Sequence, residues 1–396
     1  MKILITTDWY EPTINGVVTS VLNLRKELMQ RGHDVRVLTL SQTVHSFEAD
    51  GVTYIGSAGA GVIYPGARIK TALFSSFVQD LINWQPNIIH SHCEFSTFLI
   101  ARRISKSLNI PIIHSYHTIY EDYTHYCLPN KKWGHLMVAS LSRWVIRQTA
   151  GVIAPTEKVQ SLLNGYGINQ NIYVAPTGID IAQFSKSPSP QRCLDIKKQL
   201  GIPCENRILL YVGRLAKEKN LEELLQYYAK CNIPQVTFLI VGDGPYRDNL
   251  EHLSLELGIR NSVQFTGMIP PEQVNDYYHL GDLFLSASSS ESQGLTYIEA
   301  LASGLPALCR KDKCLDGVIL NGSNGWQYEN ENEFFDKLNF FFADTKVQKN
   351  MKINAAGLAH QMFSSVTFAE KVEHIYFDVI RDYSESWKIT RQKALS

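Results

Sequence analysis

The chain has 396 residues, 44% of them hydrophobic and 19% charged, and Lys plus Arg balances Asp plus Glu at 38 each. This length predicts two globular domains, and the balanced charge argues against nucleic acid as a partner and against membrane attraction over the whole surface. Seven scattered cysteines without a Cys-x-x-Cys, and no apolar run near the ~20 residues that span a bilayer, predict a cytoplasmic protein with reduced thiols and only peripheral membrane contact.

Short apolar runs alternate with helical patterns along the whole chain, which predicts βα units and one parallel sheet in each half. The expected strands are residues 3–7, 35–40, 87–92, 112–117, 152–155, 172–175, 208–213, 236–241, 263–265, 283–286 and 305–309. A stretch with three prolines, residues 184–204, is the expected hinge, and residues 368–391 form a C-terminal helical pattern. Ligands of such sheets bind beyond the carboxyl ends of the strands, so chemistry is expected just after each strand.

Two features follow the early strands. Gly16 begins an apolar-periodic helix and would let backbone approach a phosphate there, although a plain turn is the alternative. His90 and His92 share one face of a strand, which would permit a metal, but no third ligand is evident, so we expect structural histidines and no metal. Glu94 is expected at the mouth of the site.

The densest polar and aromatic cluster of the first half lies around residues 112–126. His117 comes directly after a strand, where its ring can reach a ligand, although a core histidine at a strand end is the alternative. The neighbouring polar side chains that we expect on the same side are Tyr120, Asp122, Tyr123 and Tyr126.

Residues 129–149 combine an apolar helical stripe with basic side chains, and no Asp or Glu occurs from Tyr123 through Thr156. Basic amphipathic helices lie on anionic lipid, so this is a candidate membrane face; a core helix with a solvated basic side is the alternative. The residues assigned to the face are Lys131, Lys132, Trp133, Arg143, Trp144 and Arg147, with Leu136, Met137, Leu141 and Val145 in the same apolar pattern.

Three strand ends in the second half are candidate site segments, and two of them carry anion-binding chemistry. Gly213-Arg214 and Lys219 give a guanidinium and an ammonium five positions apart, which suits a diphosphate. Gly244 follows the next strand, where a turn is an equal explanation. The segment 288–306 reads as loop and helix: the amides of Gly294, Leu295 and Thr296 open the helix and make an anion site, flanked by Glu291 and Glu299. An acid beside an anion site suits a nucleotide-sugar, whose hydroxyls donate to carboxylates.

Glu291-x7-Glu299 followed by Ala300-Leu-Ala-Ser-Gly-Leu-Pro306 resembles the retaining glycosyltransferases of family 4, and the Arg214-x4-Lys219 pair and the Gly16 loop resemble the same family. The resemblance implies an α/β, GT-B architecture of two Rossmann-like domains with a deep interdomain cleft. It implies that Glu291 and His117 act on the donor sugar as catalytic residues, that Glu299 binds the ribose, and that Gly244 lines the base pocket. The diphosphate would contact Gly16, Arg214, Lys219, Gly294, Leu295 and Thr296.

The run His117-Thr-x-Tyr-Glu-Asp-Tyr-x-His-Tyr126 resembles the bacterial diacylglycerol glucosyltransferases within family 4. It implies transfer of a hexose, with UDP-glucose as the expected donor, to a membrane lipid such as diacylglycerol with an α-linkage. Glu94, Tyr120, Asp122, Tyr123 and Tyr126 would lie on the acceptor side. The absence of Asp-x-Asp from the sequence predicts no essential metal or other cofactor.

The domains implied are an acceptor-binding domain at residues 1–183, joined by the C-terminal helix at 375–396, and a nucleotide-sugar domain at 184–374. Several alternatives stay open. The acceptor could be a polyprenyl-linked sugar, a glycan or a small soluble alcohol. Sugar-nucleotide epimerases share the fold, and a nucleotide-sugar-binding accessory subunit without turnover is the non-enzymatic alternative.

Overall fold

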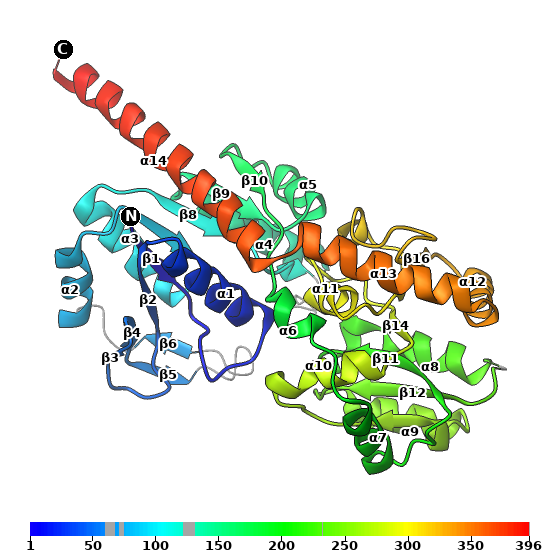
Figure 1. Cartoon of the computed structure of the whole chain (residues 1–396). Helices are drawn as coiled ribbons and strands as arrows, with labels where there is room; N and C mark the ends of the chain where they lie inside the picture. The colour runs from blue at the N-terminus through cyan, green and yellow to red at the C-terminus, as the bar shows by residue number, and fades with distance from the viewer. Residues whose placement is uncertain (60–67, 71–74, 122–130, 232, 396) are drawn as a thin grey trace. The chain divides into compact units, whose positions relative to one another are not determined.

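The computed structural model describes residues 1–59, 68–70, 75–121, 131–231 and 233–395, with the side chains of 131, 132 and 387–395 outside the description. The chain divides into two compact units (Figure 1). The first consists of Met1–Gly178 and Ser365–Ser396, and the second of Ile179–Ser364.

The first unit is built on a sheet whose order is β10-β9-β8-β7-β1-β2-β4-β3, parallel except for its β3 edge. Its strands are β1 (Lys2–Thr6), β2 (Asp34–Leu40), β3 (Phe47–Ala49), β4 (Val52–Ile55), β7 (Ile88–Ser91), β8 (Ile112–Ser115), β9 (Gly151–Ala154) and β10 (Ile172–Val174), with β5 (Ser57–Gly59) and β6 (Arg68–Lys70) as a separate antiparallel pair. Its helices are α1 (Gly16–Gln30), α2 (Ser76–Trp84), α3 (Ser96–Leu108), α4 (Lys131–Ile146), α5 (Glu157–Gly165) and α14 (Ser365–Leu395).

Both faces of this sheet are covered, because successive side chains of each strand point to opposite faces. Ile3 and Ile5 of β1 pack with α1 and α14, whereas Leu4 packs on the other face with α2 and α3. A sheet buried on both sides explains why its strands are continuous apolar runs rather than alternating ones.

Helix α14 belongs to the first unit, where it packs beside α1 (Figure 1). Phe368 and Val372 enter the core, and Ser365 donates through its hydroxyl to Glu27 at 2.7 Å. The helix therefore joins this unit from Ser365, ten residues before the expected return at 375, because its first apolar residues already have partners there.

The second unit contains a fully parallel sheet of order β13-β12-β11-β14-β15-β16. Its strands are β11 (Arg207–Val212), β12 (Val236–Val241), β13 (Val263–Phe265), β14 (Leu283–Ser286), β15 (Ala307–Arg310) and β16 (Gly325–Tyr328). Its helices are α6 (Ile181–Ser185), α7 (Pro190–Gln199), α8 (Leu221–Ala229), α9 (Arg247–Glu256), α10 (Pro271–Leu280), α11 (Leu295–Ala302), α12 (Glu331–Ala343) and α13 (Thr345–Met362), with short 3-10 turns at Lys217–Lys219, Arg260–Ser262 and Lys313–Leu315.

The division of the chain at Gly178 and Ile179 lies five residues before the expected boundary after residue 183. The reason is that Ile181 and Phe184 of α6 are buried in the core of the second unit. The proline-containing stretch 184–204 expected as a hinge is inside the second unit and holds α7.

Each sheet has a point at which its strand order reverses. In the first unit the chain order reverses between β1 and β7, and in the second between β11 and β14. Loops that leave neighbouring strands in opposite directions open a crevice there, where ligands of doubly wound sheets bind.

Among the described residues, no helix is long and apolar enough to cross a bilayer.

Candidate active site

The loops after β11 and β14 meet at the reversal point of the second sheet through an ion pair. Lys219 Nζ lies 2.6 Å from Glu291 Oε1, and both side chains are only 17% exposed. The hydroxyl of Ser290 donates to the carbonyl of Glu218 at 3.4 Å, a second link between the same loops. Two residues 72 positions apart in the sequence are thereby held as one charged group.

Arg214 lies in the same loop as Lys219 and is the more exposed of the two cations. Its guanidinium lies 3.5 Å from the carboxylate of Glu218, and its side chain is 41% exposed whereas that of Glu218 is 6% exposed. Glu218 was not among the residues predicted from the sequence. A partly exposed guanidinium next to a largely enclosed ammonium is an arrangement that can receive the oxygens of a phosphate ester.

Helix α11 begins at Leu295, and its N-cap residue, Gly294, supplies no side-chain hydrogen bond to the first turn. Gly294 precedes it in the left-handed region, with φ of +76°, where a Cβ would lie 2.5 Å from the ring of Tyr297. The sequence places Leu295 and Thr296 in the first helical turn, as expected. The amides of a first helical turn are donors for an anion.

Glu299 lies one turn further along α11 and accepts a 2.7 Å hydrogen bond from the hydroxyl of Tyr278. Burial raises the pKa of Glu299, and the bond from Tyr278 opposes that rise. Tyr278 itself is completely buried and was not predicted as a site residue.

Gly244 has a packing role in this structure. A Cβ at Gly244 would lie 2.3 Å from the carbonyl oxygen of Leu215, so only glycine lets the loop after β12 lie this close to the loop after β11. The amide of Tyr246 donates to the same Leu215 carbonyl at 3.0 Å. Gly244 thus fixes the loop that also carries Arg214.

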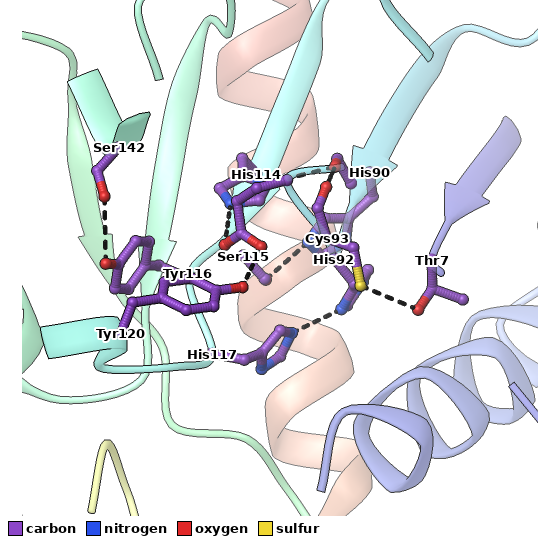
Figure 2. Close-up of polar contacts among 12 residues, drawn as sticks. Thr7, His90, His92, Cys93, His114, Ser115, Tyr116, His117, Tyr120 and Ser142 are labelled. Carbon is purple, nitrogen blue, oxygen red and sulfur yellow. Dashed lines mark hydrogen bonds and ion pairs between the residues drawn. The ribbon is translucent and has the colours of Figure 1, made fainter. Parts of the chain in front are cut away.

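The first unit brings four histidines together at the ends of β7 and β8, as Figure 2 shows. The rings of His90 and His92 lie side by side on one face of β7, with centroids 4.1 Å apart, and His92 Nδ1 lies 2.8 Å from His117 Nε2. Burial lowers the pKa of His90 and His92 well below the usual value and that of His117 to about 4. His117 follows the end of β8 at Ser115, in the loop where the sequence predicts it.

Glu94 was expected at the mouth of the site. In the structure the residue is buried, at 5% exposure. Its two oxygens are engaged: His114 Nε2 lies 3.3 Å from Oε1, and the hydroxyl of Tyr120 donates to Oε2. His114 was not predicted. Asp122, Tyr123 and Tyr126 lie outside the described residues.

Two further features border the reversal point of the first sheet. Gly16 is exposed at the start of α1, where the side chain of Asn15 caps the helix by accepting from the amide of Val18 at 2.9 Å. Asp8, which the sequence analysis did not select, caps α3 by accepting from the amides of Ser96 and Thr97 at 3.1 and 2.8 Å. Burial raises the pKa of Asp8.

Helix α4 divides the predicted apolar stripe into two sides. Val145 packs inward and Leu141 packs against the same core, whereas Trp133, Leu136, Met137 and Trp144 are 69%, 56%, 52% and 44% exposed. Arg147 is exposed, and Arg102 of α3 covers the ring of Trp144 at 5.2 Å. The side chains of Lys131 and Lys132 lie outside the described part of the chain.

The sequence profile of Glycosyl transferases group 1 matches residues 194–357, and that of Glycosyltransferase Family 4 matches residues 14–183. An alpha-monoglucosyldiacylglycerol synthase from Streptococcus pneumoniae (strain ATCC BAA-255 / R6) is 34% identical over 96% of this chain and 86% of its own length. The chain belongs to the family 4 glycosyltransferases. A second alpha-monoglucosyldiacylglycerol synthase, from Acholeplasma laidlawii, is 29% identical over 96% of this glycosyltransferase and 98% of the relative.

Solved structures share the fold of this glycosyltransferase. Anabaena Alr3699/HepE in complex with UDP-glucose superposes with a TM-score of 0.74 at 19% identity, covering 96% of this chain and 100% of that one. Sucrose-phosphate synthase (tll1590) from Thermosynechococcus elongatus gives 0.75 at 18% identity over 96% and 99%. The predicted GT-B fold and the predicted hexosyltransferase class are confirmed.

Within the described ranges, no three His, Cys, Asp or Glu side chains gather as a metal site.

Proposed function

We propose that this glycosyltransferase moves glucose from UDP-glucose to diacylglycerol with retention, forming an α-glycosidic bond on the cytoplasmic side of a membrane. The observation that carries the acceptor class is the similarity over 96% of the chain to two alpha-monoglucosyldiacylglycerol synthases. The donor class is supported by the UDP-glucose complex of a structural neighbour. It is also supported by Arg214, Lys219 and the N-terminus of α11, which follow the neighbouring strands β11 and β14.

In this proposal the diphosphate is held by Arg214, Lys219, the amides of Gly294, Leu295 and Thr296, and backbone at Gly16. The Lys219–Glu291 pair at 2.6 Å is central, because an arriving phosphate competes with Glu291 for the ammonium. Sharing of Lys219 with phosphate lets the carboxylate turn its oxygens to the sugar hydroxyls. Glu299 accepts from the ribose, and the Gly244 loop borders the base.

The proposed reaction needs no protein nucleophile. As the bond to the sugar breaks, negative charge grows on the leaving diphosphate, and the cations and helix amides stabilise it. Glu291 stabilises the positive character of the anomeric carbon, and His117 binds the sugar near that carbon. The acceptor hydroxyl attacks from the face that the diphosphate leaves, and a leaving phosphate oxygen takes its proton, which gives retention.

The acceptor side is proposed to include Glu94 and Tyr120 together with Asp122, Tyr123 and Tyr126. We further propose that α4 contacts an anionic membrane through Trp133, Leu136 and Met137. Exposed apolar side chains at i, i+3 and i+4 share one helix face, and burying each in the lipid interface is favourable by about 1–2 kcal/mol. Phe95, which precedes α3, and Leu99 of α3 are also exposed apolar side chains, at 50% and 41%.

The test is transfer of label from UDP-[14C]glucose to diacylglycerol in mixed micelles with and without anionic lipid. Label that enters the organic phase and is released by α-glucosidase supports donor, acceptor and retention together. Release of UDP into water without extracted label would refute the lipid acceptor and direct the search to polyprenyl-linked sugars and glycans. Label that only β-glucosidase releases would refute retention.

Two variant pairs sharpen this test. Glu291→Gln should lower turnover by at least about a hundredfold, since one preorganised group at a developing charge is worth roughly 3 kcal/mol. Glu329→Gln, which alters an exposed acid paired with Lys311, should not change turnover. Leu136→Ser should weaken sedimentation with anionic vesicles, while Leu255→Ser, at a similarly exposed leucine of α9, should not.

A further inference from the structure

The residue after Lys219 has an uncommon backbone conformation. Lys219 ends a 3-10 turn, and Asn220, which follows it, has φ of +52° and ψ of +39°. This left-handed conformation turns the chain from the 3-10 turn into helix α8. Residues with a Cβ rarely adopt it, and asparagine does so when its short polar side chain hydrogen-bonds locally. The position of Lys219 relative to α8 therefore depends on what holds Asn220.

Glu223, in the first turn of α8, holds Asn220 at two atoms. Its carboxylate Oε2 accepts a hydrogen bond from Asn220 Nδ2 at 3.0 Å, and its backbone amide donates to the carbonyl of Asn220 at 3.3 Å. Asn220 makes no side-chain cap hydrogen bond to α8, although it stands at the N-cap position. Its side chain donates to the carboxylate of Glu223 instead.

The same carboxylate is fixed from the ends of two strands. Arg310, the last residue of β15, donates to Oε2 at 2.5 Å, and the hydroxyl of Tyr328, the last residue of β16, donates to Oε1 at 2.9 Å. The side chain of Glu223 is 15% exposed, and Tyr328 is completely buried. Because the strand order is β11-β14-β15-β16, these bonds connect the segment after β11 with two strands that are not its neighbours.

An acid in a first helical turn can be explained by the helix dipole alone, and Glu222 offers the comparison. Glu222 lies next to Glu223 in the same turn, and its carboxylate accepts from the hydroxyl of Tyr246. Either acid would suit the dipole. Glu223 in addition joins Asn220 to the ends of β15 and β16, and the dipole does not require that arrangement.

We propose that Glu223 is a positioning residue for donor binding: it fixes Asn220 and thereby the place at which Lys219 meets Glu291. The inference rests on the proposed function, in which Lys219 holds the donor diphosphate. It needs no unpaired ammonium, because the group that is positioned is the Lys219–Glu291 pair at 2.6 Å. A loop that is already held leaves less to be ordered when the donor binds.

The sign of the effect separates this role from a simple effect of charge. Glu223 and UDP are both negative, so removal of the carboxylate would strengthen UDP binding if only charge mattered. If Glu223 positions Lys219, its removal weakens UDP binding instead. Glu223→Gln removes the charge but keeps an oxygen that can accept from Asn220, so this variant separates the hydrogen bond from the charge.

The experiment is calorimetric measurement of UDP binding by the full-length protein. Glu223→Met should weaken binding about threefold to tenfold, because it removes a hydrogen-bonded group that holds the loop, and Glu223→Gln should recover most of the loss. Glu222→Met, the matched control, removes the neighbouring acid and should not weaken binding. Unchanged or stronger binding by folded Glu223→Met would overturn the proposal, and so would an equal loss in Glu222→Met.

A double-mutant cycle shows whether Glu223 acts through Lys219. When Lys219 is already replaced by methionine, Glu223→Met should change the affinity for UDP by less than about twofold, because the positioned ammonium is gone. A loss of stability alone would act equally in both backgrounds, so it cannot produce this difference. A full effect of Glu223→Met in the Lys219→Met background would overturn the proposal.

Asn220→Gly is the second variant, and it decides the question if Glu223→Met does not fold. Glycine adopts the left-handed conformation readily but lacks the amide that bonds Glu223. We expect weaker UDP binding by Asn220→Gly, with no such loss when Lys219 is methionine. Binding equal to that of the parent would overturn the proposal.

The proposed function and this inference can be told apart by Lys219→Met. If Lys219→Met leaves UDP binding unchanged, the diphosphate contact in the proposed function is wrong, and the inference fails with it. If Lys219→Met weakens UDP binding but Glu223→Met and Asn220→Gly do not, the diphosphate contact stands and the positioning role of Glu223 is refuted.

Discussion

Substitution of Gly294 by alanine should damage the second unit through two separate effects. The φ of +76° at Gly294 lies in the left-handed region, where a Cβ costs about 1–2 kcal/mol. The new Cβ would also lie 2.5 Å from Cδ2 of Tyr297. That ring cannot swing away easily, because it is 1% exposed and its hydroxyl donates to Ser286 at 2.7 Å. Such overpacking costs a further ~1–3 kcal/mol.

Gly258→Ala is a matched control in the same unit. Gly258 has a φ of +70°, and a Cβ there would have nothing within 4 Å. It therefore carries the backbone cost alone, so the difference between the two variants isolates the contact with Tyr297. We expect Gly294→Ala to unfold in urea with a free energy ~1–3 kcal/mol below that of Gly258→Ala.

The same pair of variants reports on the anion site. Gly294→Ala should weaken the binding of UDP in calorimetry because it shifts the first turn of α11, whereas Gly258→Ala should bind as the parent does. Equal unfolding free energies for the two variants would refute the packing argument. Unchanged UDP binding by a folded Gly294→Ala would refute the use of the α11 N-terminus.

Three further predictions concern other contacts. Lys219→Met should weaken UDP binding about tenfold or more, because a charge-assisted contact is worth ~1.5–3 kcal/mol, while Lys311→Met at an exposed pair should not. Burial raises the folded-state pKa of Glu299, so the stability given by its neutral form is present at low pH and is lost as the pH rises through that pKa. Glu299→Gln should therefore be more stable than the parent at neutral pH and lose this advantage in acid, and parallel pH curves would contradict the assignment. Tyr376→Phe removes the 2.6 Å bond to His90 and should cost about 1 kcal/mol in urea unfolding, whereas Tyr383→Phe, which removes only a 3.4 Å bond to Asn109, should cost nothing measurable.

Local sequence determined much of the architecture. Every strand expected from an apolar run is present, with ends shifted by a residue or two, because strands buried on both faces are continuous apolar segments. Strands β3 to β6 and β16 were missed. β3 is exposed throughout, two of the three residues of β5 are exposed and β6 is partly exposed, and these short strands carry no apolar pattern to reveal them.

The residues of the candidate site also divide into those that a local sequence pattern reveals and those that it does not. Arg214, Lys219, Glu291 and the start of α11 could be found because strand ends, glycines and helix starts are local signals. Tyr278 and His114 could not, since each is defined by a carboxylate on another element, Glu299 and Glu94 respectively. Glu218 lies between Arg214 and Lys219, but the burial of its side chain, 6% exposed beside Arg214, is set by tertiary packing that the local sequence does not reveal.

By itself, the sequence determined two α/β halves, the type of chemistry after each strand, and the family that those residues resemble. Only the tertiary structure decided which side of α4 faces outward, that Lys219 and Glu291 are one charged pair, and that His92 bonds His117. The physical reason is that parallel strands adjacent in a sheet are far apart in the chain. The contacts between their loops depend on strand order, which residue patterns do not encode.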